Sequence, residues 1–246
     1  MNNIIKTFLI GLFFGTFGTT LGGIIGVTIN KKTNRFLSCI LSFASGLMIA
    51  MVCFDLIPEA MKLSGIINVI VGIVLGIIVM ILCDVYVQKK IDFKIKKAGN
   101  SLLKTGIIVG IGLAIHNFPE GLAIGSGFDA SIVLGYSLAI AICLHDIPEG
   151  ISMAIPMKNG GIGKIRVIVY VILSGVTTGI GAFLGAVVGE ISQDIIAICL
   201  SFSAGAMLYI VSGELIPESN KMYSGKWSVI SNMIGVIIGL IVINFN

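Results

Sequence analysis

Charged side chains are scarce in this sequence. Of its 246 residues, 11% are Asp, Glu, Lys or Arg and 56% are apolar, whereas an average soluble domain carries about 25% charged residues. A water-soluble protein of this length must still cover most of its surface with polar groups. The mean hydropathy of +1.07 therefore excludes a soluble globule, and the same composition excludes a disordered chain and a nucleic-acid-binding domain.

Paired cysteines are also missing. The five cysteines lie singly in apolar runs without CxxC spacing, which predicts small buried hydrophobic residues rather than disulfides or a metal cluster. They are Cys39, Cys53, Cys83, Cys143 and Cys199. The sequence has no Walker-type phosphate loop, HExxH motif or nucleophile elbow, so it carries no sign of an ATPase or a common hydrolase.

Long apolar runs, in contrast, are abundant. A helix needs about 20 mostly apolar residues to cross a bilayer, and eight such runs occur. They are at 7–29, 36–58, 65–88, 103–127, 131–155, 166–189, 195–217 and 227–244. The first is longer than the apolar part of a signal peptide, so we predict that it is a retained helix. We predict an all-α integral membrane protein with eight transmembrane helices, in which residues 1–246 form a single domain.

Lys and Arg are unevenly distributed between alternate loops. Fourteen of them lie in the loops at 30–35, 89–104, 156–166 and 219–226. The opposite side holds two, Lys6 and Lys62. Because positive charge stays on the cytoplasmic side, we predict a multi-pass protein of the cell (cytoplasmic) membrane with both termini extracytoplasmic. The basic loop from 89 could contact anionic lipid or a regulator, but orientation alone accounts for its charge.

The chain contains an internal repeat. With a shift of 159 residues, SFASGLMIAMVCFDLIPEA at 42–60 matches SFSAGAMLYIVSGELIPES at 201–219 at nine of nineteen positions. Spans 1 to 3 and 6 to 8 are thus two copies of one unit, in a 3+2+3 arrangement around spans 4 and 5. Because five spans separate their starts, the copies enter the membrane from opposite sides. Inverted repeats are typical of transporters with a midplane substrate site; structural symmetry without transport is the alternative.

Spans 4 and 5 carry the two histidines of the chain, in the motifs HNFPEG and HDIPEG. Positions i and i+4 share a helix face, so His116 lies with Glu120, and His145 lies with Glu149. Two such faces offer two ring nitrogens and up to four carboxylate oxygens, a donor set suited to Zn, Fe, Mn or Cd. One dication neutralises both carboxylates, which removes most of the cost of keeping them in lipid.

Each of these residues also has a simpler interpretation. A single histidine in a membrane helix is more often a packed core residue than a ligand, but two histidines in one duplicated pattern favour the metal site. Asn117 and Asp146, one position further along each motif, are either additional ligands or hydrogen-bond partners of the ligands.

The paired motifs in the fourth and fifth of eight spans closely resemble those of the ZIP family of divalent metal transporters (Zrt- and Irt-like proteins), bacterial type. The resemblance covers essentially the whole chain, and it implies a single transporter domain, net metal movement into the cytoplasm and homodimers. It also implies a metal site between spans 4 and 5, commonly binuclear with bridging glutamates. The first site would be formed by His116, Glu120, His145 and Glu149, and the second by Asn117 and Asp146 with the same glutamates.

One departure from the family pattern concerns the second site. Bacterial members often have SGLxEP in the sixth span, whose Glu completes that site; here the segment is SGVTTG, with Thr178 at the Glu position. We therefore expect the second site to be weak or absent. The resemblance further suggests that Met48 in the second span lies near the metal, although a methionine there is more often a packing residue.

The repeat also suggests where a transport pathway begins and ends. Asp55 and Glu59 fall near the outer end of span 2, and Glu214 and Glu218 near the inner end of span 7. One pair would mark an entrance and the other an exit. Acidic residues at membrane ends can also simply face water.

Together these observations predict a passive or secondary transporter and not an enzyme. It would require no cofactor, and its partners would be the lipid bilayer and a divalent metal as substrate, zinc first, with Cd, Fe or Mn as alternatives. No nucleic acid is expected. Two other functions use the same residues: an intramembrane metal-dependent hydrolase and a metal sensor without transport.

Overall fold

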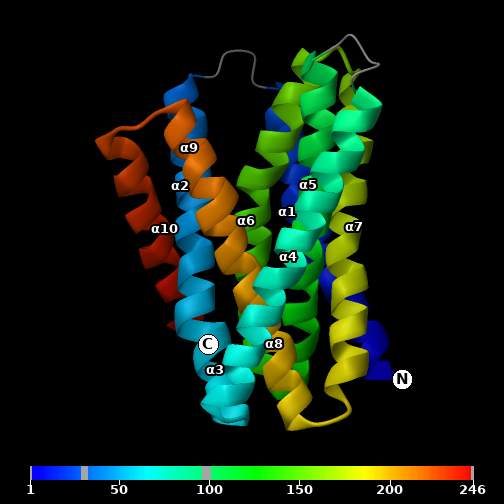
Figure 1. The fold of residues 1–246 in the computed structure, drawn as a ribbon, viewed down its shortest axis with the longest axis vertical. Coiled ribbons are helices and arrows are strands. Elements are labelled where there is room, and N and C mark those ends of the chain that lie inside the picture. Colours follow the sequence, from blue (N-terminus) through cyan, green and yellow to red (C-terminus); the bar gives the residue numbers. More distant parts are fainter. Residues whose placement is uncertain (1, 29–32, 96–100, 245–246) are drawn as a thin grey trace.

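The computed structural model describes residues 2–28, 33–95 and 101–244, and every regular element within those residues is a helix. Eight helical rods lie at the eight expected positions (Figure 1). Six are continuous: α1 Asn2–Thr28, α4 Ile66–Ile95, α5 Ser101–Ala130, α6 Ile132–Asn159, α7 Lys164–Gly189 and α10 Lys226–Asn244. Seven rods have the length and apolar character to cross a membrane, as judged on the described residues. Together with α5, these seven rods confirm the predicted all-α integral membrane fold.

The remaining two rods are each built from three consecutive segments. The first is α2 Asn34–Met51, η1 Val52–Leu56 and α3 Ile57–Leu63; the second is α8 Gln193–Ile210, η2 Val211–Leu215 and α9 Ile216–Met222. Every boundary in the first rod recurs in the second after a shift of 159 residues. Figure 1 shows the two rods running in opposite directions, α3 lying at the bottom and α9 at the top. The inverted repeat predicted from the sequence is therefore present in the fold.

The segments η1 and η2 are π-helical, a feature that the apolar pattern did not predict. Each ends at the Leu of its LIPE motif, two residues before the Pro. The Ile57 N–H bonds to the carbonyl of Val52, five residues back, and the Ile216 N–H bonds to Val211 in the same way. Since proline has no N–H, it interrupts the α-helical bonding just beyond this point. A single wide turn in each copy absorbs the interruption, as π-bulges do in other helices.

Several helices extend beyond the apolar runs that predicted them. The third span was expected to end at residue 88, but α4 continues to Ile95, so Lys89, Lys90 and Lys94 belong to a helix and not to a loop. Lys and Gln are good helix formers, and a helix does not have to end where the hydrocarbon does. Lys96 and Lys97, the remaining lysines of that predicted loop, lie outside the described residues.

Four helices form a closely packed bundle. In it α1 packs against α6 and α7, and α5 packs against the same two helices. Glycines allow the close approach, because a Cβ on Gly121 of α5 would lie 2.0 Å from the Thr178 carbonyl oxygen of α7. The contact is reciprocal, since a Cβ on Gly181 of α7 would lie 2.2 Å from the Phe118 carbonyl oxygen of α5. Small residues at such contacts are the usual means of packing helices in membranes.

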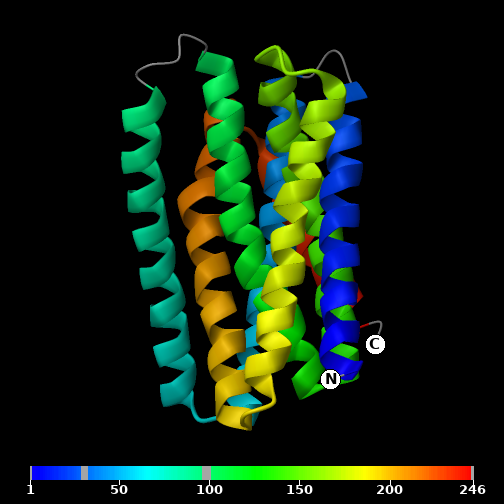
Figure 2. The same cartoon turned by 90° about the vertical axis from the view of Figure 1, so that its right-hand side faces the viewer.

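The other four rods form two pairs beside this bundle. The first pair is α2 with α10, and the second is α4 with α8 (Figures 1 and 2). The inverted repeat interchanges the two pairs, since it relates α2 to α8 and α4 to α10. The two pairs meet the bundle mainly through α6 and α5, respectively. This arrangement places the HNFPEG and HDIPEG helices at the centre of the molecule.

The four connections expected to be cytoplasmic all join helix ends at one end of the molecule. The helix ends that flank these connections lie together at the top of Figure 1: the end of α1 and start of α2, the end of α4 and start of α5, the end of α6 and start of α7, and the end of α9 and start of α10. The short links α3 to α4, α5 to α6 and α7 to α8 lie at the opposite end. The alternation required by the prediction is therefore present, while the side of the membrane on which each end lies stays a prediction.

The cysteines are all unpaired. Cys143 and Cys199 are buried, as expected, but Cys53 is exposed on the outer surface of the rod that contains it. The prediction that all five are buried within the protein is therefore wrong for Cys53. In a membrane helix an apolar side chain can face outward, because the hydrocarbon solvates it.

Candidate metal centre

The six polar residues of the HNFPEG and HDIPEG motifs are buried at the interface of α5 and α6. His116, the most accessible of them, is 6% exposed. The full set is His116, Asn117 and Glu120 on α5 with His145, Asp146 and Glu149 on α6. Burying this many polar groups in an apolar bundle is costly unless each finds a partner.

Four of these residues converge on one point. Ligand atoms from Glu120, His145, Asp146 and Glu149 all lie within 4.8 Å of one another. The His145 Nε2 is 2.9 Å from Glu149 Oε1 and 3.1 Å from Glu120 Oε1. The contact with Glu149 joins residues four apart on one helix, and the contact with Glu120 joins α6 to α5. The cluster therefore holds three carboxyl groups around one imidazole.

The polar atoms of this cluster lack hydrogen bonds. Both ring nitrogens of His145 and all six carboxyl oxygens of Glu120, Asp146 and Glu149 have no partner of normal hydrogen-bond geometry in the described part of the chain. Nearly all buried polar groups in folded proteins are hydrogen-bonded. A group of eight such atoms in one place is best satisfied by a cation, which several oxygens and a nitrogen can bind at once.

His116 makes a different contact. Its Nε2 lies 3.2 Å from Glu214 Oε1, and it is absent from the group of ligand atoms that converge within 4.8 Å. Glu214 belongs to η2, so the wide turn before Pro217 brings this carboxylate to the edge of the centre. Three of the four residues expected in a first site thus lie together, while the fourth joins the centre to a residue expected on the pathway.

Asn117 and Thr178 lie on the side of the centre that faces α7. The Asn117 Nδ2 donates to the Ser174 carbonyl oxygen over 3.1 Å, and its Oδ1 has no partner among the described residues. Thr178 is fully buried with an unpartnered hydroxyl. Its side chain packs over Gly15 of α1, where a Cβ would lie 2.6 Å from the Thr178 Oγ1. The sixth span does pack beside the fourth, as the resemblance implies.

Met48 occupies the apolar core. It is completely buried in the same cluster as Met51, Ile142 and Met207. Met207 is its counterpart in the repeat, since the two positions differ by 159. Packing accounts for this environment without a metal, so the suggested role of Met48 near the metal stays a prediction.

The four acidic residues proposed for the pathway have equivalent positions in the two copies but different contacts. Asp55, in η1, accepts a hydrogen bond of 3.1 Å from Ser137 of α6, whereas its counterpart Glu214 contacts His116. The two positions are therefore not equivalent in this structure, because Glu214 contacts a histidine of the HNFPEG motif and Asp55 contacts a serine.

The glutamates of the two LIPE motifs behave alike. Glu59 forms an ion pair of 2.8 Å with Lys62, and Glu218 forms one of 3.7 Å with Lys221. Each pair joins residues three apart on one helix. Lys62 and Lys221 are largely exposed, at 72% and 75%, so both pairs lie at the surface, where such interactions contribute little stability.

One polar contact between two apolar rods could not be predicted from the sequence. The Tyr209 hydroxyl of α8 donates to Asp84 Oδ2 of α4 over 2.7 Å. The available signal was an acidic residue near the end of a predicted span, since Asp84 lies in the span 65–88 just after its charge-free part. Its partner could not be identified, because α4 and α8 are far apart in the sequence.

The chain is similar in sequence to known proteins. A sequence model of the ZIP zinc transporter family matches residues 88–246. The chain is 30% identical to the zinc transporter ZupT of Clostridium perfringens, over 97% of this chain and 95% of that protein. It is 29% identical to ZupT of Escherichia coli O127:H6, over 93% and 91% of the two chains. It is also 35% identical to the zinc transporter ZIP11 of Xenopus tropicalis, over 58% and 44%.

Proposed function

The chain belongs to the ZIP family of zinc transporters, and on this premise we propose that it carries zinc across the cytoplasmic membrane into the cytoplasm as a passive or secondary transporter. The centre between α5 and α6 would be the substrate site. Cd, Fe and Mn are the other metals to which an imidazole and carboxylates are suited. The proposal assigns no catalysed reaction and no resident cofactor, because the metal is the cargo.

The residues of the converging cluster have distinct roles in this proposal. His145 provides a nitrogen ligand, and Glu120 from α5 and Glu149 from its own helix α6 provide the anionic oxygens. Together they neutralise a dication, so that neither the metal nor the carboxylates remain as uncompensated charge in lipid. Asp146 lies close enough to contribute a further oxygen.

His116 and Glu214 would connect the centre with the exit. In the structure His116 contacts Glu214 rather than the cluster. We propose that His116 takes part in binding the metal and then passes it toward Glu214. Glu218 would follow Glu214 at the inner mouth, and Asp55 and Glu59 would collect metal at the outer mouth.

A second metal would bind less strongly than the first. Its ligands would be Asn117 and Asp146 together with the two shared glutamates, and at Thr178 a neutral hydroxyl replaces the carboxylate common in bacterial relatives. A neutral hydroxyl is a weak ligand for a dication compared with a carboxylate. We propose one tightly bound metal and a second that is bound weakly if at all.

The single observation that carries the proposal is the set of buried ligand atoms that converge between α5 and α6 without hydrogen bonds of normal geometry to the described residues. The test is zinc uptake into sealed proteoliposomes by the wild-type protein, Glu149→Gln and the matched control Glu190→Gln. Glu190 is an exposed glutamate at the end of α7. We expect uptake by the wild type and Glu190→Gln, and little uptake by Glu149→Gln, because the amide removes a negative ligand without changing its size.

The same assay separates the other two functions that the residues could serve. A metal sensor would bind zinc without accumulating it inside the vesicles. A hydrolase would cleave a substrate without stoichiometric metal movement. Competition among Zn, Cd, Fe and Mn in the same vesicles would establish the metal preference. Binding without accumulation by the wild-type protein would refute the transport proposal.

A further inference from the structure

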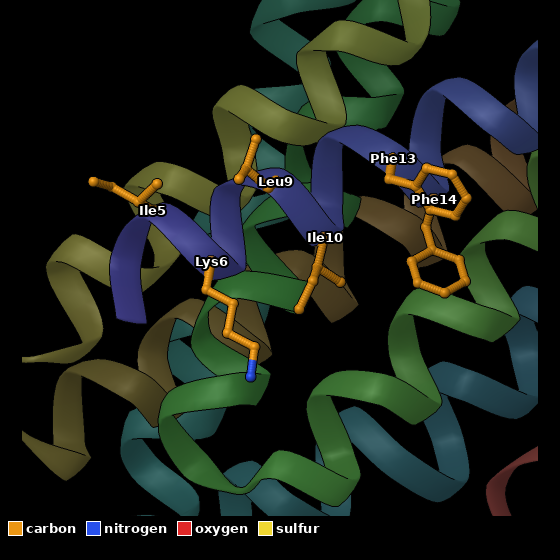
Figure 3. A pocket seen from close by; sticks show the side chains of 6 residues that line it. All are labelled: Ile5, Lys6, Leu9, Ile10, Phe13 and Phe14. Carbon is orange, nitrogen blue, oxygen red and sulfur yellow. The ribbon is translucent and has the colours of Figure 1, made fainter. Parts of the chain in front are cut away.

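A shallow, open groove along the first half of α1, lined by residues of that helix, takes no part in the metal centre. Its volume is about 360 Å³, and it is lined by Ile5, Lys6, Leu9, Ile10, Phe13 and Phe14. Figure 3 shows the Lys6 ammonium at one end of this lining and the rings of Phe13 and Phe14 at the other. The groove is thus apolar along most of its length and carries a single cation.

The spacing of the lining residues gives the groove an inner floor and an outer edge along the helix. Lys6, Ile10 and Phe14 are four apart and share one face of α1. Ile10 and Phe14 pack against the central apolar core, so they form a fixed floor. Leu9 and Phe13 are more than half exposed and form the edge that faces the membrane. At about 1.5 Å per residue, the floor extends about 12 Å from Lys6 to Phe14.

Lys6 lies where the first apolar run begins, so its ammonium is placed at the level of the lipid headgroups while the groove continues into the hydrocarbon. The side chain is exposed. Among the ion pairs of the described residues none involves Lys6. Lys62, the other lysine at this end, pairs with Glu59 instead.

We propose that this groove binds an anionic phospholipid. Its phosphate contacts the Lys6 ammonium, and one acyl chain lies along Ile10 and Phe14. A free phosphate ion would use the cation but none of the apolar floor. A zwitterionic phospholipid would use the floor, but its own positive group would offset part of the attraction of Lys6 for the phosphate. The lipid site is separate from metal transport and goes beyond it.

The test measures bound lipid by native mass spectrometry of the full-length protein in detergent. Phosphatidylglycerol and phosphatidylcholine with identical acyl chains are added to the wild type, Lys6→Gln and Lys62→Gln. We expect the wild type to prefer phosphatidylglycerol. Lys6→Gln should bind it about fivefold more weakly, which corresponds to about 1 kcal/mol for one lysine near a phosphate. Lys62→Gln should bind it as the wild type does, because Lys62 is engaged by Glu59.

A second variant tests the apolar part of the groove. Ile10→Trp fills the floor and should reduce the tightly retained fraction of both lipids, whereas Lys6→Gln should affect phosphatidylglycerol alone. Equal binding of the two lipids by the wild type would overturn the proposal. So would an unchanged Lys6→Gln, or a Lys62→Gln variant that loses as much binding as Lys6→Gln. Since lipid binding is measured directly, the result does not depend on whether zinc is transported.

Discussion

His145 lies in the middle of the proposed metal centre. It is completely buried, and its Nε2 lies within 3.1 Å of carboxylates from two different helices. The contact with Glu120 joins α6 to α5, and the contact with Glu149 lies within α6. The chemistry of the site is therefore concentrated at one imidazole and its two glutamates.

Single alanine substitutions should show how much each proposed ligand contributes to zinc affinity and to uptake. We expect His145→Ala, Glu120→Ala and Glu149→Ala each to weaken zinc binding by about 100-fold or more, since loss of even an indirect partner of a metal ligand costs about 10- to 100-fold. His116→Ala should also abolish most uptake, but with a smaller loss of binding because His116 contacts Glu214. Calorimetric zinc titration and vesicle uptake measure the two effects. Wild-type uptake by a well-folded His145→Ala variant would contradict the site assignment.

Thr178 offers a test for the second site. We expect Thr178→Glu to add a carboxylate beside Asn117, whose charge is costly in lipid unless a second dication compensates it. The variant should therefore bind a second equivalent of Cd, with first-site affinity little changed. Calorimetric titration with Cd measures both equivalents.

The matched control for this experiment is Thr177→Glu. Thr177 is the neighbouring residue, turned about 100° away on the helix, and its hydroxyl already donates to the Ser174 carbonyl oxygen. It should gain no second metal. Two tight equivalents in the unmodified protein, or a gain that is equal in both variants, would show that Thr178 does not occupy the position assigned to it.

At the scale of helices, the contact between α5 and α7 determines the position of half of the centre. Gly121 follows Glu120 directly and sits against the Thr178 carbonyl oxygen. A side chain at this point must move α5 away from α7, and a ligand on α5 must move with it. The geometry of the site thus depends on a residue that has no ligand atoms.

Gly121→Ala should therefore weaken both folding and metal binding. Overpacking of a buried contact costs about 1–3 kcal/mol, and displacement of Glu120 should reduce zinc affinity as well. Gly65→Ala is the control, because a Cβ on Gly65 would have nothing within 4 Å. Thermal unfolding in detergent and zinc titration of the two variants provide the comparison. Equal stability and affinity in both would show that the close approach is not required.

A second helix contact distinguishes the two copies of the repeat. At one end of the molecule the hydroxyls of Ser38 and Ser42 hydrogen-bond with Ser219 at 2.9 and 2.6 Å. Ser38 also contacts the Ser228 hydroxyl at 2.6 Å, which links α2 with α9 and α10. In the other copy, the position equivalent to Ser38 is Ala197 and the position equivalent to Ser219 is Ala60. The serine cluster therefore has no equivalent among the described residues at the other end of the symmetric backbone, where Ser64 instead donates to Asp194 Oδ1 over 2.8 Å.

For the whole molecule, the orientation in the membrane determines the direction of transport. Gly65 and Gly163 lie at opposite ends, and a Cβ at either position would have nothing within 4 Å. In a cysteine-free background, we expect Gly65→Cys to react with a membrane-impermeant maleimide in intact cells. Gly163→Cys should react after the cells are opened. Labelling of Gly163→Cys in intact cells would reverse the orientation inferred from the basic loops.

Transport by the whole molecule should need no ATP. An inside-negative potential contributes about 2.3 kcal/mol per charge per 100 mV, or about 4.6 kcal/mol for a dication that enters without exchange of a proton. Zinc uptake into proteoliposomes should therefore increase when a potassium diffusion potential makes the interior negative. Vesicles with the potential abolished are the control. Protein that stays inactive until ATP is supplied would contradict this prediction.

The helices, the repeat and one pair of donor residues could be predicted from local features of the sequence. The length of each apolar run predicted a membrane helix, because about 20 apolar residues are enough to cross the hydrocarbon. The LIPE segments predicted the repeat, and the spacing of His145 and Glu149 placed two donors on one helix face, because side chains four apart overlap on a helix. These conclusions need one helix at a time and no knowledge of its neighbours.

The remaining features depend on how the helices pack. The contact of His116 with Glu214, the approach of Glu120 to His145 and the bond between Tyr209 and Asp84 each join residues from different rods. Hydrophobic periodicity does not encode such contacts, because lipid-facing and protein-facing apolar residues look alike in a membrane helix. The glycine contacts between α5 and α7 bring the helices close enough to bury the ligands together. The sequence by itself thus determined which groups are available to bind a metal, and the tertiary structure decided which of them meet.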